Sequence, residues 1–229
     1  MPGTGFLAAG MMRVLTGVCT FLFDSKPFVD SGPRRITGEV NVSQTGGDVT
    51  LDTTNNILNE ACAYFNGKAY IRLNPGSDDV SWSITGNFLI HGWARVSDAA
   101  QSYYTIFDYG RFEGIMLRPG SDGDNLRIFG ASYSLMNVFP LNTWVYYAVA
   151  RENNTISLYT ATHGSTTATI RVSKLVPATA VVNQSNLDPI LGASRHSGFG
   201  ELFLGQMSNF EVRYPVSSVN TTSVPFFVL

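Results

Sequence analysis

The sequence predicts an all-β protein, an antiparallel sandwich of two sheets. In windows of about a dozen residues, apolar side chains do not recur at i, i+3, i+4 and i+7, as they would along an amphipathic helix. Short runs of β-branched and aromatic residues instead alternate with clusters of Gly, Pro, Asn, Asp and Ser. Only 14% of the residues are charged, against about 25% in an average soluble domain, which favours sheets and turns over solvated helices.

The expected strands are short and follow one another along nearly the whole chain, which is typical of a sandwich or barrel. With 44% hydrophobic and 12% aromatic residues, the chain can bury a large core. In chain order the expected strand regions are 18–23, 48–53, 62–73, 87–96, 102–110, 113–119, 125–131, 143–151, 155–163, 168–174, 188–194 and 205–214.

Two connections have the composition of tight reversals. Residues 118–125 contain Pro119, Gly120 and Gly123 among small polar residues, and residues 152–154 place two Asn between apolar strands. In the strand before that second turn, Trp144, Tyr146, Ala148 and Ala150 should face one way and Val145, Tyr147 and Val149 the other. Both faces are apolar, so this strand should be covered on both sides.

No composition shift or linker divides the chain, so one domain is expected over residues 18–229, preceded by an arm or extra strand at residues 1–17. The arm is apolar, but Arg13 interrupts it, and we expect neither an export signal nor a membrane span. The arm and the C-terminal tail are apolar enough to act in assembly. The assembly candidates are Phe6, Leu7, Met11, Met12, Phe226 and Phe227.

Charge and cysteine content exclude several classes of function. The formal net charge of −2 gives no basic field for nucleic acid or an anionic membrane, so neither partner is expected. Cys19 and Cys62 are too few for a disulfide framework or a structural zinc site. Both lie in apolar runs, which favours two buried free thiols; a single bridge between them is the alternative.

The order of segments resembles the laminin-G-like and concanavalin A-like jelly roll, in the form found in structural proteins of tailed phages. The resemblance covers about residues 18–227 and includes a hairpin expected at ACAYFNGKAYIRL. The segments that match, in order, are FLFDSKPFVDSG (21–32), ACAYFNGKAYIRL (61–73), FLIHGWARV (88–96), TWVYYAVARENNTISLYTATHG (143–164), ILGASRHSGFGELFLGQMSNFEVRY (190–214) and VRYPVSSVNTTSVPFF (212–227).

The resemblance implies a non-enzymatic structural protein of a tailed-phage virion, assembled in the host cytoplasm, as a surface decoration, tail-fibre or baseplate component. Its partners would be other virion proteins or further copies of itself as a homo-oligomer, with adhesion to the host surface as a further role. The alternative is a carbohydrate-binding module for cell-surface or extracellular glycan. An enzyme that degrades glycan on the same scaffold is the third reading.

The titratable residues argue against catalysis. A sandwich glycosidase needs two carboxylates on one strand face, and no such run occurs; nor does a Gly-x-Ser-x-Gly elbow. No cofactor or metal site is expected, although the acidic turns leave calcium open as an alternative. Sugar binding would use aromatic faces beside polar groups. The glycan-binding candidates are Tyr103, Tyr104, Asp108, Arg111, Arg195, His196 and Phe199.

Overall fold

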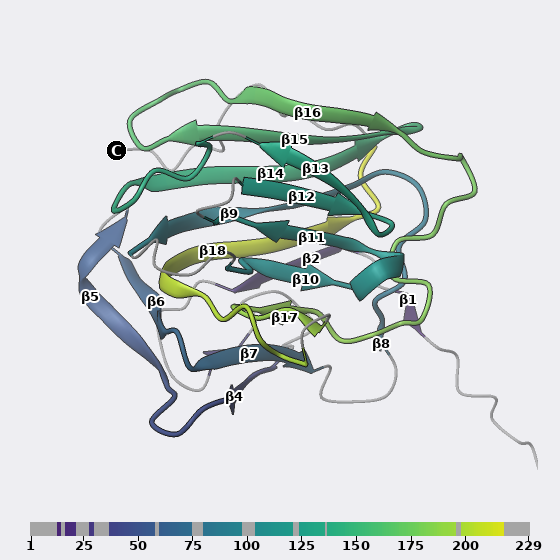
Figure 1. Cartoon of the computed structure of the whole chain (residues 1–229). Helices are drawn as coiled ribbons and strands as arrows, with labels where there is room; N and C mark the ends of the chain where they lie inside the picture. The colour runs from purple at the N-terminus through teal and green to yellow at the C-terminus, as the bar shows by residue number, and fades with distance from the viewer. Residues whose placement is uncertain are drawn as a thin grey trace, which may run out of the picture.

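A computed structural model of the 229-residue chain forms a two-layer β-sandwich (Figure 1). The structure describes residues 13–14, 17–21, 28–29, 37–57, 60–74, 80–97, 104–120, 124–135, 137–195 and 198–217. Both layers are antiparallel, as the sequence predicts. Within these ranges, no helix has the length and apolarity needed to cross a bilayer.

The first layer, called the β9 sheet, has the strand order β16-β15-β14-β9-β18-β6-β5, and β2 also pairs with β18. The bounds are β2 Gly17–Phe21, β5 Val49–Ile57, β6 Glu60–Asn66, β9 Phe88–Val96, β14 Trp144–Glu152, β15 Thr155–Thr162, β16 Thr169–Leu175 and β18 Leu204–Tyr214.

The second layer, called the β11 sheet, has the order β13-β12-β11-β10-β17-β7-β4-β3. A short parallel pair, β1 with β8, lies outside both layers. The bounds are β1 Arg13–Val14, β3 Phe28–Val29, β4 Thr37–Val42, β7 Ala69–Asn74, β8 Val80–Ser81, β10 Phe107–Tyr109, the 3-10 turn η1 Arg111–Glu113, β11 Ile115–Arg118, β12 Asp124–Ile128, β13 Ala131–Leu135 and β17 Ile190–Leu191.

The core lies between the two sheets and is built from alternate residues of each strand. In β14, Val145, Tyr147 and Val149 belong to this core. Tyr146 and Ala148 belong to a second apolar cluster on the opposite, outer face of the β9 sheet. The predicted division of this strand into two buried faces is therefore confirmed, and so is the turn that follows it, where Asn153 has φ of 53°.

The connection from β6 to β7 differs from the expected hairpin. These strands do not pair; β6 lies in the β9 sheet and β7 in the β11 sheet, so residues 66–68 carry the chain from one layer to the other. Alternation explains the difference, because Phe65 and Ile71 both point into the core from opposite layers. A tight turn between two apolar runs has the same composition in both arrangements.

Several predictions fall on parts of the chain that the structure does not describe. The assembly candidates Phe6, Leu7, Met11, Met12, Phe226 and Phe227 all lie outside the described residues. Of the proposed arm, Arg13–Val14 pairs with Val80–Ser81. The division at residue 17 stays a prediction.

Cys62 is a buried free thiol, as predicted. The structure does not describe the side chain of Cys19. Burial, with a smaller contribution from the nearby Asp52 carboxylate, raises the pKa of the Cys62 thiol to about 12. Because the thiolate is the reactive form, we predict that native Cys19→Ser protein is not labelled by a thiol reagent at pH 8. The same protein in urea should give one reactive thiol per chain. Rapid labelling of the native protein would contradict the burial of Cys62.

Candidate functional site

Strand register places a row of polar and aromatic residues across the outer face of the β9 sheet. Gln206 on β18 pairs with Tyr64 on β6 and with Arg95 on β9. Arg95 in turn pairs with Trp144 on β14. Side chains of paired residues lie on the same face of a sheet. Each member of the row has a core residue beside it on its strand, for example Ala94 and Val96 beside Arg95 and Met207 beside Gln206, so the row faces outward.

The second half of β5 crosses over this face. Between the pairs Asp52–Cys62 and Ile57–Glu60, β5 has four residues where β6 has one, so β5 must arch away from its partner. We call residues 52–57 the β5 arch. Its Ile57 packs in the outer apolar cluster, and its Asn55 carbonyl accepts the Trp144 Nε1–H at 3.2 Å. Figure 1 shows β5 rising along one side of the sandwich.

An open polar hollow of about 500 Å³ lies between the arch and the residues Tyr64, Gln206 and Arg95 of the row, a volume within the usual range for small-ligand sites. Tyr64, Gln206 and Arg95 form its floor on three adjacent strands, and β5 forms its wall. The lining residues are Thr50, Leu51, Asp52, Thr53, Thr54, Asn55, Tyr64, Arg95, Ser97 and Gln206.

Gln206 is the centre of the polar contacts in the hollow. Its Oε1 accepts hydrogen bonds from Arg95 Nη1 at 2.9 Å and from the Ser97 hydroxyl at 3.2 Å. Its Nε2 donates to Asp52 Oδ2 at 3.1 Å. Arg95 Nε donates to the Asn142 carbonyl at 3.2 Å. Arg95 has five side-chain N–H donors, so within the described residues three of them, two on Nη2 and one on Nη1, have no protein acceptor.

Asp52 holds the arch in place. Its Oδ1 accepts the Thr54 and Asn55 amides at 2.8 and 3.0 Å, and its Oδ2 accepts the Asn55 side-chain amide at 3.1 Å in addition to Gln206. Burial raises the pKa of Asp52, but these hydrogen bonds outweigh burial and the net effect lowers it. The four bonds use the acceptor sites of an ionised carboxylate, so Asp52 positions its neighbours.

The next row of side chains on the outer face, beside the hollow, is buried rather than accessible. Ser208 pairs with Trp93, and Trp93 pairs with Tyr146. Trp93 and Tyr146 are 4% and 3% exposed, with ring centroids 5.5 Å apart. The Trp93 Nε1 and Ser208 Oγ are buried and have no hydrogen-bond partner among the described residues. His163 is exposed, and its ring lies 6.1 Å from Trp93, edge to face.

An ion-pair network around the buried Glu211 lies further along the same face. Glu211 Oε2 lies 2.7 Å from His91 Nε2, and Arg213 donates to both Glu211 oxygens at 2.8 and 2.9 Å. Burial raises the pKa of Glu211, whereas His91 and Arg213 lower it, and the balance brings it to about 2. This network replaces the hydration that Glu211 loses on burial.

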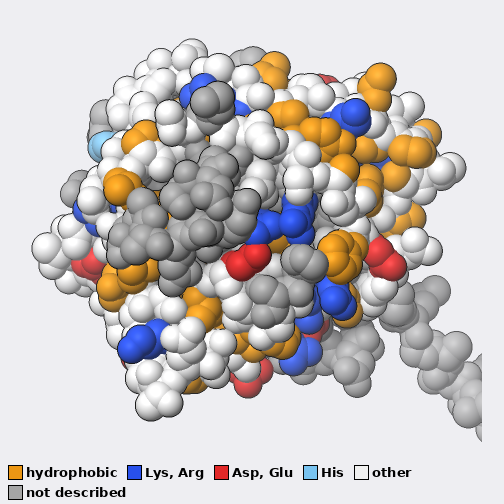
Figure 2. Space-filling model, viewed as in Figure 1, with side chains coloured by type: hydrophobic (Ala, Val, Ile, Leu, Met, Phe, Trp, Pro, Cys, Tyr) orange, Lys and Arg blue, Asp and Glu red, His pale blue; other side chains and the backbone are white. Residues whose placement is uncertain are grey.

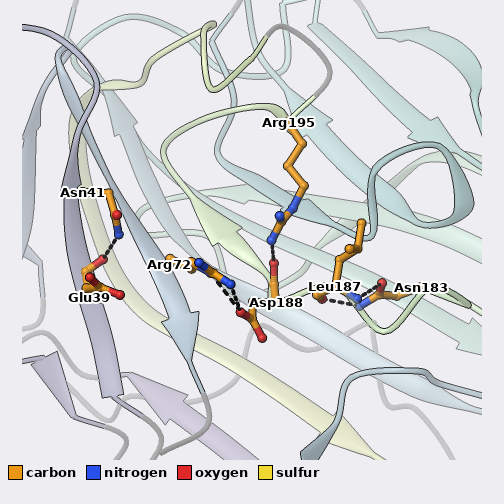
Figure 3. A network of polar contacts seen from close by, with 7 residues as sticks. All are labelled: Glu39, Asn41, Arg72, Asn183, Leu187, Asp188 and Arg195. Atoms are coloured by element: carbon orange, nitrogen blue, oxygen red, sulfur yellow. Dashed lines mark hydrogen bonds and ion pairs between the residues drawn. The ribbon is translucent and has the colours of Figure 1, made fainter. Parts of the chain in front are cut away.

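Three of the predicted glycan-binding residues gather on the outer side of the β11 sheet. The Arg195 amide donates to Asp108 Oδ2 at 2.8 Å, and the Arg195 guanidinium lies 6.0 Å from the centre of the Phe199 ring. Phe199 stacks on Tyr70 at 5.0 Å. Figure 3 shows Arg195 reaching the Asp188 carbonyl while Arg72 pairs with the Asp188 carboxylate at 2.6 Å.

Two of the predicted glycan-binding residues are buried: Tyr104, and Asp108 of the group just described. Tyr104 is 1% exposed and packs in the core, so the prediction that its ring faces a ligand is wrong. Asp108 is fully buried, and its second oxygen accepts the Arg111 amide at 2.7 Å, which makes it a structural residue rather than a ligand contact. Arg111 is exposed and its guanidinium lies over Phe112. Tyr103 and His196 lie outside the described residues.

The residues of the hollow were missed at the sequence level. A signal was present in β9, where Leu89, His91, Trp93 and Arg95 alternate with core residues and so share the outer face. Their neighbours on β18 and β6 depend on register, which alternation within one strand does not give.

Charges elsewhere on the molecule are dispersed. Side chains of both signs are scattered among uncharged polar atoms over the surface shown in Figure 2. No group of three or more His, Cys, Asp or Glu able to hold a metal ion occurs within the described parts of the chain.

Neither a protein-family model nor a curated protein sequence matches the chain. Solved structures do match its fold. Domain 4 of AbnA, a GH43 extracellular arabinanase from Geobacillus stearothermophilus, in complex with arabinotriose, has a TM-score of 0.62 and 16% identity over 92% of this chain and 95% of that one. The binding domain of botulinum neurotoxin serotype D has a TM-score of 0.54 and 12% identity, over 89% of this chain and 48% of that one. The two-sheet jelly-roll sandwich predicted from the sequence is confirmed.

The Glu211 network predicts a defined dependence of stability on pH. Because the folded pKa of Glu211 is depressed, its stabilisation is complete above about 4.5 and is lost as the pH falls toward 2. Glu211→Gln should lower the free energy of unfolding at pH 7 by about 2 kcal/mol, since it removes the charge that pairs with the buried His91 and the half-exposed Arg213. Urea denaturation at several pH values should show a weaker acid dependence than in the unmodified protein. An equal slope, or an equal loss in the exposed control Glu152→Gln, would contradict the assignment.

Proposed function

We propose that this chain is a non-enzymatic carbohydrate-binding module that holds a glycan in the hollow beside the β5 arch. The observation that carries the proposal is the row Tyr64–Gln206–Arg95, which sets an aromatic ring, an amide and a guanidinium side by side on the floor of a 500 Å³ hollow. A sugar ring has an apolar face and a rim of hydroxyls, and recognition needs both kinds of group in one place.

Each floor residue has a role that its geometry supports. Tyr64 is partly exposed and offers its ring to the apolar face of a sugar. Arg95 is fixed by its bonds to Gln206 and the Asn142 carbonyl, so that its Nη2 donors are directed before a ligand arrives. Thr50, Thr53 and Ser97 add hydroxyls around the rim. Fixing donors in advance reduces the entropy lost on binding.

Binding without hydrolysis agrees with the carboxylates of the site. Glycoside hydrolysis requires a pair of carboxyl groups about 5–10 Å apart. Asp52 is the single acid among the residues that line the hollow, and its oxygens already accept four hydrogen bonds. Its lowered pKa also makes it a poor proton donor near neutral pH.

The comparisons support the carbohydrate-binding alternative better than the virion role. The arabinanase domain, which matches nearly the full length of both chains, was solved with arabinotriose. At 16% identity the likeness concerns the fold, so the proposal depends on the hollow itself. The virion role has no support from the described residues, since its assembly candidates lie outside them.

A glycan array followed by isothermal titration calorimetry tests the proposal. Arg95→Met should weaken binding of the best glycan at least tenfold, because a hydrogen bond to a charged group contributes about 1.5–3 kcal/mol. Tyr64→Ala should have a similar effect through loss of the ring face. Arg127→Met and Tyr133→Ala, the same substitutions on β12 and β13 of the other sheet, are the matched controls and should bind normally. A lack of binding to any glycan on the array would overturn the function, and equal losses in control and site variants would overturn the site.

A further inference from the structure

We propose that the ligand is a neutral oligosaccharide of three or more units that crosses the strands, and that Trp144 and His163 form a second subsite for it. This inference rests on the proposed carbohydrate-binding function. It adds the direction in which the glycan lies, its minimum length and the residues that hold its far end.

The register of the β9 sheet extends the floor of the hollow in a straight line. Beyond Arg95, the next member of the row is Trp144 on β14, and the His163 amide donates to the Trp144 carbonyl at 2.9 Å across to β15. Tyr64 and Trp144 are separated by three strand intervals, or about 14 Å. One sugar ring cannot span that distance, whereas a chain of about three units can.

The two residues beyond the hollow are accessible, unlike their neighbours. Trp144 is partly exposed and His163 is exposed. Trp93 and Tyr146, one row away, are nearly inaccessible, and Trp93 supports the subsite because the His163 ring packs edge to face against it. Aromatic and imidazole rings at an accessible edge suit the apolar face of a sugar.

The hollow and the second subsite share a wall. Asn55 lines the hollow, and its carbonyl accepts the Nε1–H of Trp144. This bond fixes the indole beside the arch, so a ligand that follows the wall out of the hollow reaches the Trp144 ring. The arch therefore borders a continuous surface that leads from the hollow to the Trp144 ring.

The charges of the hollow favour a neutral ligand. Among the residues that the structure describes, Arg95 and Asp52 are the charged ones that line it, and their formal charges cancel. An acidic sugar would gain attraction from Arg95 but would lie close to the ionised Asp52 carboxylate.

A length series tests the second subsite. The best-binding neutral sugar from the array is titrated as one to five linked units against the full-length chain. Affinity should rise at least tenfold between one and three units and change little after four. In His163→Ala and Trp144→Ala the rise should largely disappear, while affinity for one unit stays within twofold of the unmodified chain.

Two further variants distinguish the loss of a ligand contact from the loss of folding. Trp144→Phe removes the bond to Asn55 but keeps a ring, so it should retain most of the rise with length. Phe112→Ala, an exposed ring near the other sheet, should retain all of it. His163→Ala changes an exposed side chain and tests the subsite even if Trp144→Ala fails to fold.

The possible failures are distinct. Equal affinity for all lengths in the unmodified chain would overturn the second subsite while leaving the hollow as a binding site. Tighter binding of an acidic sugar than of a neutral sugar of equal length would overturn the neutral class. An absence of binding at every length would overturn the proposed function itself.

Discussion

The pairing of β18 with β9 and β6 is the constraint on which both the core and the hollow depend. Side chains alternate between faces, so a slip of one residue would move Met207 from the core to the outer face and Gln206 into the core. The register shift between Ser208 and Glu211 then resets the strand, so that Phe210 and Val212 again fill the core. One strand thus positions the hollow at its start and the buried Glu211 network near its end.

The β5 arch divides the outer face of the β9 sheet into two parts with different physical roles. Over the row that contains Trp93 and Tyr146, the arch contributes Ile57 to an apolar cluster, and burial there stabilises the sheet. Over the row that contains Gln206, it presents Asp52 and Asn55 and leaves a hollow. The extra residues of β5 therefore cover the row that contains Trp93 and form one side of the hollow over the row that contains Gln206.

How much of the fold and of the hollow could be predicted depends on how far apart in the sequence the interacting residues lie. The two faces of β14 and the turn at Asn153 follow from alternation and turn chemistry within a dozen residues, and both were predicted. The crossing from β6 to β7 and the row through Gln206 depend on which strands pair and in what register. A single sequence carries no direct signal for that pairing, and the arch depends on it as well.

The burial of Asp108 shows why residue type is a weak guide to a binding site. Asp108 and Arg195 have the chemistry of sugar recognition, but Asp108 accepts two backbone amides and is fully buried, so it serves the fold. Asp52 also accepts two backbone amides, yet beside it Arg95 has Nη2 donors with no acceptor among the described residues. What distinguishes a site is a polar group that the fold orients but does not satisfy. On that criterion the proposed recognition depends on the Arg95 donors, and the Asp52 carboxylate contributes by holding the β5 arch beside them.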